Sequence, residues 1–371
     1  MDQLSNLLQH MNTIDASDLF LSADRPATYR VRGQLIPPDG PDFSPEKIDQ
    51  MARLFMLDEH FVQFEKNPEI NVGVSLPHIG RFRVNIFKQR HTTAMVIRAI
   101  PAKIPTMREL GLPKVLEKIS MLPNGIVLVV GPTGTGKSSS LASMVKFRCE
   151  HECCHVMTLE DPIEFIHNEK SSIVNQREIG VDTQDYHQGL VNVLRQSPDV
   201  LMIGEVRDVD VLEKLLEFSD TGHLCMSTLH ANNVTQAVER MISMFPEEKR
   251  DSAQVSLAGN LRAVIAQKLI PSSDGKQVLA YELHTFTAHT TDLIRRGEIG
   301  KIQEFIEKDS SDMSQTFDES LFELYKHDKI TEGSAIRYAK SSANMKLKFR
   351  LDTGPNPSVV NNIPPRNPFG H

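Results

Sequence analysis

The chain has 371 residues, a length that favours two domains over one. Charged residues make up 24% and hydrophobic residues 40%, and the net charge of −7 gives no general attraction to nucleic acid or anionic lipid. The four cysteines form no CxxC pair, which argues against a zinc knuckle or a disulfide framework and favours reduced thiols in a cytosolic protein. The start has no basic segment typical of a secretory signal, and no apolar run reaches membrane-spanning length, so we expect no direct membrane insertion.

The first hundred residues predict a small α+β unit. Apolar residues at helical spacing predict a first helix, with one face formed by Leu4, Leu7, Leu8 and Met11. The segments "DLFLS" and "TYRVRGQLI" then predict strands. A single long helix capped by Ser44 is expected over "SPEKIDQMARLFMLDEHFVQFEK". Three more strands are predicted at "INVGVSL", "GRFRVNIFKQR" and "TTAMVIRAI".

The rest of the chain predicts a linker, a second domain and a tail. Residues 101–113 hold three prolines and form the linker. From residue 114 to 285 helices alternate with apolar strands, which indicates a mainly parallel α/β core. Helical patterns dominate residues 286–350. The end, 351–371, is rich in Pro, Asn and Gly and is expected to be disordered.

The stretch "VVGPTGTGKSSSLASM" carries the strongest motif. An apolar strand precedes three glycines, and a helical pattern follows them, which is the context of a phosphate-binding loop. Glycines let successive backbone N–H groups point at one phosphate, Lys137 can reach the β- and γ-phosphates, and the Ser138 hydroxyl can ligate Mg²⁺. The alternative is a glycine turn before an ordinary helix. The residues assigned to nucleotide binding are Gly131, Pro132, Thr133, Gly134, Thr135, Gly136, Lys137, Ser138 and Ser139.

Acidic residues follow two further predicted strands. "HVMTLEDPIEF" ends a strand at Glu160 and Asp161, and "SPDVLMIGEVRD" places Glu205 just after another. In a parallel sheet, the strand ends meet at the edge that carries the phosphate loop. A carboxylate there can hold Mg²⁺, directly or through water, or orient an attacking water. Acidic residues after strands also act as helix N-caps, which is the competing interpretation of each cluster taken alone.

Two histidines and an arginine-bearing strand complete the candidates. His223 and His230 flank an apolar segment in "TGHLCMSTLHANN"; a histidine can donate to a phosphate oxygen, although a lone one is more often structural. In "GRFRVNIFKQR" strict alternation places Arg81 and Arg83 on one face, and Arg98 lies near the end of the next strand. These arginines either form a solvated face or complete the nucleotide site of a neighbouring subunit.

Together these motifs resemble the PilT/PilU family of type IV pilus retraction ATPases over about residues 1 to 350. "GPTGTGKSSS" matches the family's Walker A motif, "TLEDPIEF" its aspartate box, "VLMIGEVRD" its Walker B region and "TGHLCMSTLHANN" its histidine box. Ser139, where PilT-type chains usually have Thr, and the extended C-terminus point to the PilU branch. The chain also lacks the zinc-binding cysteine set and the long extra N-terminal domain of many assembly and secretion relatives.

The resemblance implies a PAS-like N-terminal domain (1–100), a RecA-like P-loop ATPase core and a homo-hexamer that uses ATP and Mg²⁺. It assigns Glu160 to orienting or activating water and Glu205 to the Mg²⁺ shell, although these two roles are exchangeable. His223 and His230 become the histidine-box residues. Arg83, Arg98 and Arg81 match the arginines that complete a neighbour's site.

The function implied is an ATP-hydrolysing motor for pilus retraction, at the cytoplasmic side of the inner membrane. Its expected partners are a PilT-type ATPase and an inner-membrane platform protein. Two alternatives remain open: an assembly-direction motor of the same family, and an accessory ATP-binding ring with little motor role of its own. A DNA-translocating ring is weaker because the sequence has no basic stretch or nucleic-acid-reading module, and no nucleic-acid partner is expected.

Overall fold

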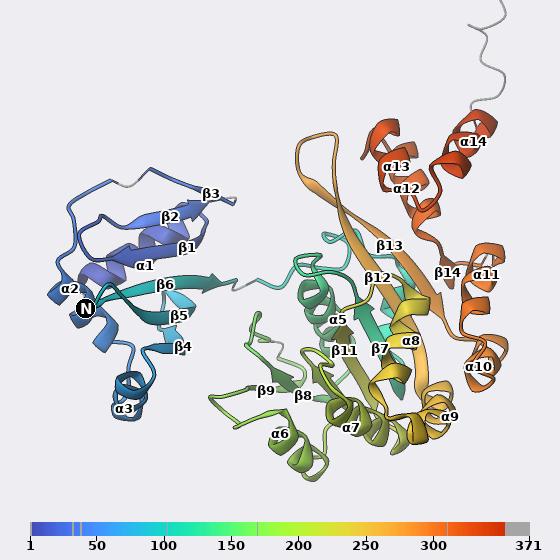
Figure 1. Cartoon of the computed structure of the whole chain (residues 1–371), viewed down its shortest axis with the longest axis horizontal. Helices are drawn as coiled ribbons and strands as arrows, with labels where there is room; N and C mark the ends of the chain where they lie inside the picture. The colour runs from blue at the N-terminus through green and yellow to red at the C-terminus, as the bar shows by residue number, and fades with distance from the viewer. Residues whose placement is uncertain are drawn as a thin grey trace, which may run out of the picture. The chain divides into compact units, whose positions relative to one another are not determined.

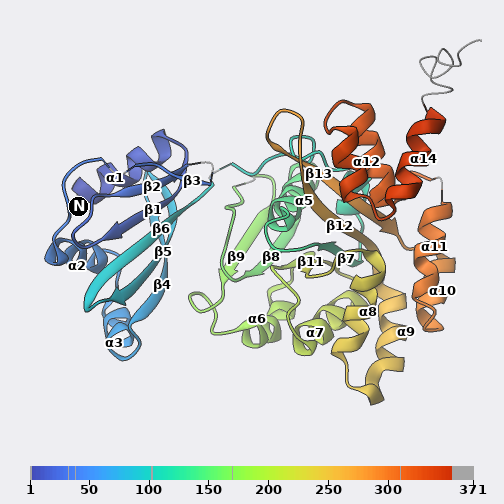
Figure 2. The same cartoon turned by 45° about the horizontal axis from the view of Figure 1, so that its top comes forward.

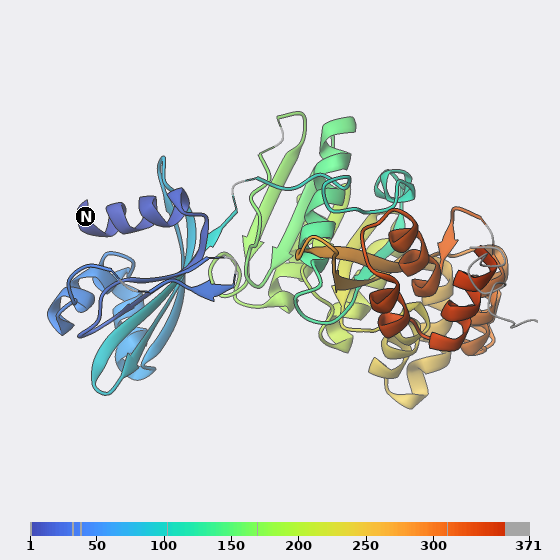
Figure 3. The same ribbon diagram turned by 90° about the horizontal axis from the view of Figure 1, so that it is seen from above.

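The computed structural model describes residues 2–31, 33–37, 39–101, 103–168, 170–309 and 311–352. Contacts divide the chain into two compact units. The first combines Met1–Ile104 with Thr158–Lys170 and Val174–Asn192, and the second combines Pro105–Met157, Ser171–Ile173 and Val193–His371. Figures 1, 2 and 3 show the elements of both units from three directions.

The N-terminal residues form an antiparallel six-stranded sheet in the order β3-β2-β1-β6-β5-β4. Its strands are β1 (Ala16–Ser22), β2 (Thr28–Val31), β3 (Gln34–Leu35), β4 (Glu69–Leu76), β5 (Gly80–Gln89) and β6 (Thr92–Ile100). In β5, Phe82, Val84 and Ile86 are buried, whereas the side chains between them are partly exposed. The predicted alternation of this strand is therefore confirmed.

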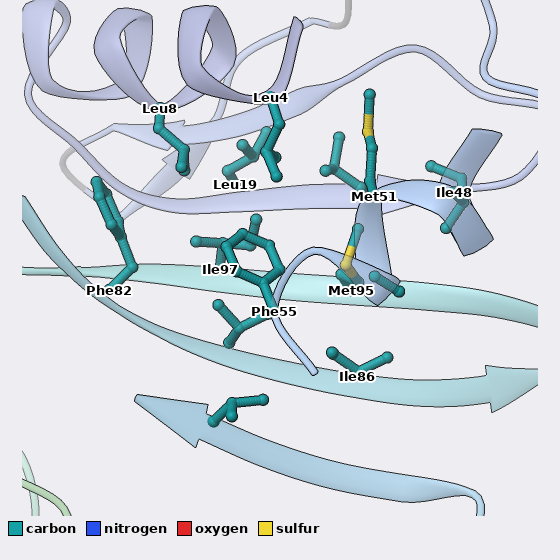
Figure 4. Close-up of a cluster of buried hydrophobic side chains, with 14 of the residues drawn as sticks. Leu4, Leu8, Leu19, Ile48, Met51, Phe55, Phe82, Ile86, Met95 and Ile97 are labelled. Atoms are coloured by element: carbon teal, nitrogen blue, oxygen red, sulfur yellow. The ribbon is translucent and has the colours of Figure 1, made fainter. Parts of the chain in front are cut away.

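Helices α1 (Asp2–Thr13) and α2 (Pro45–Arg53) pack on the apolar face of this sheet (Figure 4). Leu8 of α1 and Ile48 of α2 share one buried cluster with Phe82 of β5. Burial of this apolar face is the main favourable term available to so small a sheet. The predicted N-cap is confirmed, because the Ser44 hydroxyl accepts a hydrogen bond from the Lys47 backbone N–H at 3.3 Å.

Two elements of this region that were predicted to be continuous are interrupted. The expected long helix is broken into α2 and α3 (Asp58–Lys66), and the chain turns between them so that Phe55 and Met56 are buried. One straight helix of that length, at about 1.5 Å per residue, would carry these side chains past the edge of the small core. The expected strand "TYRVRGQLI" is a hairpin, β2 and β3, with Gly33 in its turn at a φ of +80°.

The second sheet has eight strands in the order β14-β13-β12-β7-β11-β10-β8-β9. They are β7 (Gly125–Val130), β8 (His155–Glu160), β9 (Ile173–Glu178), β10 (Val200–Ile203), β11 (Leu224–Leu229), β12 (Leu261–Pro271), β13 (Gln277–Thr285) and β14 (Ser314–Gln315). The pairs β10–β11, β11–β7 and β7–β12 are parallel, whereas β12–β13 and β13–β14 are antiparallel. Every residue of β7, β10 and β11 is buried, as in parallel strands covered on both faces.

In the sequence, helices alternate with the central strands of this sheet, and further helices come after its long antiparallel strands. They are α4 (Val115–Ser120), α5 (Lys137–His151), α6 (Tyr186–Val193), α7 (Val209–Asp220), α8 (Val234–Met244), α9 (Arg250–Asn260), α10 (Ala288–Arg295), α11 (Gly300–Lys308), α12 (Phe317–Lys326), α13 (Glu332–Tyr338) and α14 (Ser342–Asp352). The predicted fold class, an α+β N-terminal domain, an α/β core and a helical C-terminal region, is confirmed. Of the predicted tail, residues 351 and 352 end α14, and 353–371 lie outside the described residues.

Candidate nucleotide and catalytic site

The glycine-rich loop connects the end of β7 to the start of α5. Gly131, Gly134 and Gly136 have φ values of +156°, +80° and +82°, which side-chain-bearing residues rarely adopt. A Cβ on Gly131 would lie 2.7 Å from the Gln267 carbonyl oxygen and 2.7 Å from Thr135 Oγ1. Only glycine fits this close approach, so the loop closes tightly under the first turn of α5.

Lys137 is the first residue of α5 and folds back over the loop. Its Nζ donates to the carbonyl oxygens of Gly131 and Pro132 at 2.9 and 3.0 Å. Thr135 Oγ1 donates to Pro132 O at 2.9 Å and closes the loop from the other side. A helix N-terminus presents backbone N–H groups and a partial positive charge, and the Lys137 ammonium adds to that charge at the start of α5. This arrangement suits a polyphosphate.

Buried polar contacts fix the loop from below. The Gln267 side chain of β12, 1% exposed, donates from Nε2 to Ser140 Oγ at 2.7 Å, and Ser140 is itself buried in α5. Gln267 thus joins β12 to the helix that carries Lys137, and Ser138 and Ser139 remain partly exposed in the first turn. Sequence reasoning missed Gln267, because a lone glutamine in an apolar strand gives no motif.

Glu205 lies two residues beyond β10, between two cationic or cation-forming side chains. Its Oε1 is 2.9 Å from His230 Nε2, and its Oε2 accepts from Arg207 Nε at 3.2 Å. The backbone beneath is fixed, because Thr228 Oγ1 donates to Gly204 O at 2.6 Å and the Val206 N–H donates to Thr228 O at 2.9 Å. The structure therefore brings Glu205 and His230 together, and adds Arg207, which the motif "GEVRD" contains but sequence reasoning did not select.

His230 also lies beside the loop, whereas His223 does not. The parallel register pairs Leu229 with Val130, and the Gly131 N–H donates to Leu229 O at 3.3 Å, so His230 follows the strand next to the loop. His223 precedes the same strand, and its carbonyl accepts from Gly125, the first residue of β7. Its ring packs on Phe218 at a centroid distance of 4.6 Å. Within one chain, His223 is thus at the opposite end of β7 from the phosphate loop.

Glu160 ends β8 in a nearly dry environment. Its side chain accepts from Thr158 Oγ1 at 2.7 Å and from Gln176 Nε2 at 3.1 Å, and the residue is 7% exposed. Burial raises the pKa of the Glu160 carboxyl above its usual range, and the hydrogen bonds from Thr158 and Gln176 oppose that shift. A carboxylate with a raised pKa is the type of group that serves as a general base.

The three candidate arginines occupy different surroundings. Arg98 and Arg83 are cross-strand partners on β6 and β5, and Arg98 Nε donates to the buried Asp18 at 2.7 Å. Arg83 has no hydrogen bond or ion pair from its side chain among the described residues. Arg81 Nη2 donates to Glu178 Oε2 of β9 at 3.2 Å, inside the first unit. Among the described residues, Arg83 is thus the one of the three whose side chain has no partner, although Arg98 is the more exposed, with 60% of its side chain accessible.

The described residues hold no group of three or more His, Cys, Asp or Glu side chains arranged to bind a metal ion. The donors near the loop are the Ser138 hydroxyl and the Glu205 carboxylate, and hard oxygen donors of this kind suit Mg²⁺ when phosphate oxygens complete the shell. The tightly closed glycine loop fits the phosphates, so the residues present fit a nucleotide with Mg²⁺.

Comparisons with known proteins agree on one family. Residues 3–343 match the family model described as type II/IV secretion system protein. The chain is 40% identical to the type IV pilus ATPase PilU of Pseudomonas aeruginosa, over 94% of this chain and 92% of that one. It is 35% identical to the pilus retraction ATPase PilT of the same organism, over 92% of this chain and 99% of that one. A crystal structure of the pilus retraction motor PilT with bound ADP matches this chain with a TM-score of 0.86 at 33% sequence identity. The match covers 93% of this chain and 99% of that one. Within the described residues no helix is both long and apolar enough to cross a membrane.

Proposed function

Because the chain belongs to the family of type II/IV secretion system proteins, we propose that it is an ATP-hydrolysing motor for type IV pilus retraction, acting as a PilU-type partner of a PilT-type ATPase. The names of its relatives support the pilus and the retraction direction. The chemistry of the site supports the hydrolysis. On this proposal the protein works at the cytoplasmic side of the inner membrane and contacts a platform protein there.

The observation that carries the enzymatic part is the loop itself. Three glycines at positive φ bend the chain, and Gly131 lies where no Cβ fits. Lys137 places its ammonium over the bend, at hydrogen-bonding distance from two loop carbonyls. A glycine turn before an ordinary helix needs neither the close approach nor the inward lysine. Recognition of a triphosphate accounts for both.

The remaining roles follow from position and charge. Ser138 and Glu205 would hold Mg²⁺, which when bound neutralises charge on the phosphates. Glu160 would accept a proton from, or orient, the attacking water. His230, beside the loop and bonded to Glu205, would sense the γ-phosphate. His223, at the far end of β11 from its own chain's loop, would serve the site of another subunit.

We infer further that the working form is a homo-hexamer in which Arg83 and Arg98 complete a neighbour's site. Arg83 lies on a stiff strand, and its guanidinium has no partner in the part of the chain that the structure describes, which suits a cation for another subunit's transition state. Proposed domain bounds are 1–100, a linker 101–113, 114–285, 286–350 and a tail 351–371.

The direct test is Mg²⁺-dependent ATP hydrolysis by the purified chain, with Lys137→Ala as the inactive comparison. We expect wild type to release phosphate and Lys137→Ala to lose both affinity and turnover, since the main cationic phosphate contact is gone. In cells, retraction is compared in strains that lack this chain, the PilT-type ATPase, or both. Turnover that survives Lys137→Ala would contradict the enzymatic part, and normal retraction without this chain in every background would contradict the motor part.

The trans arginine is tested by mixing subunits. Arg83→Ala should bind ATP and lose most of its turnover, and a mixture of Arg83→Ala with Lys137→Ala should recover activity, because some interfaces then join an intact loop to an intact arginine. Native mass spectrometry confirms that mixed rings formed. Near-normal turnover of Arg83→Ala, or mixed rings without rescue, would contradict the role in trans.

A further inference from the structure

Strand β9 lies at the edge of the second sheet, and sequence reasoning assigned it no role. Three of its contacts meet the segment that begins at Glu160. Gln176 donates to the Glu160 carboxylate, Glu178 Oε2 accepts from the Ile163 N–H at 3.2 Å, and the N–H of Ile179, just past the strand, donates to Glu160 O at 2.8 Å. Gln176 and Glu178 are two residues apart on a strand, so their side chains leave the same face. That face of β9 therefore holds the residues following β8 in place.

Gln176 makes three hydrogen bonds that together determine how its amide is oriented. Its Oε1 accepts from the His167 backbone N–H at 3.0 Å, and its Nε2 donates to Phe165 O at 2.8 Å and to Glu160 Oε1 at 3.1 Å. A flipped amide would place an NH₂ group against an N–H donor and an oxygen against two acceptors. The N–H group facing Glu160 is therefore imposed by the backbone, not chosen by Glu160.

We propose that Gln176 is a positioning residue for Glu160, which fixes one carboxylate oxygen and favours the ionised form that a general base requires. This inference rests on the proposed ATPase function. Thr158 supplies the second donor to the same oxygen, at 2.7 Å. With both donors on Oε1, the carboxylate cannot rotate about its terminal torsion without breaking two hydrogen bonds. Gln176 thus acts through Glu160 and not on the substrate.

The hydrogen bond from Gln176 predicts a measurable effect on the pH dependence of kcat. Glu160 is almost completely buried, which disfavours its charge, and the donors from Thr158 and Gln176 counteract this by stabilising the carboxylate. The titratable group that also acts on it is His167, whose positive form would favour the carboxylate as well. Loss of the Gln176 donor therefore makes the carboxylate harder to form, and a higher pH is needed to reach the active state.

The experiment is the pH profile of kcat for Gln176→Leu, which keeps the volume and removes the amide. We expect the acid limb to move to higher pH by about one unit, so that kcat falls about tenfold at pH values below the wild-type acid limb and little above it, because one hydrogen bond to a charge is lost. Binding of a fluorescent ADP analogue should be unchanged. Raising the pH should restore much of kcat, which a merely structural defect would not allow.

Two further variants make the result decisive. Thr158→Val removes the other donor to the same oxygen at equal size and should shift the acid limb in the same direction, even if Gln176→Leu folds poorly. Gln188→Leu is the matched control: Gln188 is exposed on α6, so the same substitution there should leave the pH profile of kcat unchanged. In a Glu160→Gln background, Gln176→Leu should add nothing, since the group it positions is gone.

The inference is overturned if Gln176→Leu and Thr158→Val both keep the wild-type profile, or if both lower kcat equally at every pH. These outcomes are separate from failure of the proposed function. A wild-type protein that does not hydrolyse ATP would contradict the ATPase assignment itself, whereas an active wild type with unshifted variants contradicts only the role of Gln176.

Discussion

The two strand-end carboxylates stand in opposite environments. Glu160, after β8, is nearly buried and is held by two neutral donors, a threonine hydroxyl and a glutamine amide. Glu205, after β10, keeps 23% of its side chain exposed and lies between His230 and Arg207. Both positions hold a glutamate at the end of a strand or just beyond it. The side chain of Glu160 is shielded from water, whereas that of Glu205 is partly exposed and forms an ion pair.

This difference separates the roles that the motifs left exchangeable. A buried carboxyl with neutral partners gains proton affinity, which suits proton transfer. A partly exposed carboxyl group that pairs with an arginine and adjoins a histidine offers oxygen ligands at an accessible position, which suits holding a metal ion. Environment therefore favours Glu160 for the water and Glu205 for Mg²⁺.

The largest expected effect comes from neutralising each carboxylate in turn. Glu160→Gln and Glu205→Gln should both lower kcat, by roughly 10²-fold or more, because each removes a group proposed to act in the transition state. The comparison is sharpened by titrating Mg²⁺. Only Glu205→Gln should raise the Mg²⁺ concentration needed for half-maximal rate. An increase for Glu160→Gln alone would reverse the two assignments.

A smaller effect is expected from the cation next to Glu205. Arg207→Ala leaves the carboxylate without one charge-assisted hydrogen bond and should lower kcat about tenfold. Because the negative charge of Glu205 is then less compensated, the Mg²⁺ requirement should fall, not rise. Arg296→Ala is the control, since Arg296 is exposed and pairs with Asp292 at 2.7 Å on α10. A higher Mg²⁺ requirement in Arg207→Ala would show that the arginine, and not the glutamate, organises the phosphates.

The smallest effect concerns stability. Burial raises the folded-state pKa of Glu160, so the folded chain keeps this proton to a higher pH than the unfolded chain. The cost of the buried charge is absent below the unfolded pKa, grows between the two values and is complete above the folded one. Glu160→Gln should therefore raise the melting temperature most at a pH above the folded-state pKa, with the gain shrinking as the pH falls toward the unfolded-state pKa. Glu205→Gln, which only loses ion-pair contacts, should show no such gain; equal behaviour of both variants would remove the contrast.

Local pattern was enough for much of this molecule. Period-two alternation in β5 predicted that Arg81 and Arg83 share one face, and strand, glycines and helix predicted the loop, because both signals lie within a few neighbouring residues. The predicted family is confirmed by the similarity to PilU and PilT. The continuous helix through Met56 was wrong, since apolar spacing does not reveal where a small core forces the chain to turn.

The sequence by itself determined that a phosphate loop exists and that carboxylates and a histidine follow later strands, because their chemistry is encoded in contiguous motifs. Only the tertiary structure decided their surroundings. The motif places His223 and His230 at opposite ends of one strand, and the parallel pairing of β11 with β7 decides that the His230 end lies beside the phosphate loop. Gln176 donates to Glu160 because β9 lies next to β8 in the sheet. The two residues are 16 positions apart in the sequence, and no local pattern predicts this contact. How deeply a side chain is buried depends on many residues that are distant in sequence and come together only in the folded chain. This difference in burial distinguishes Glu160 from Glu205.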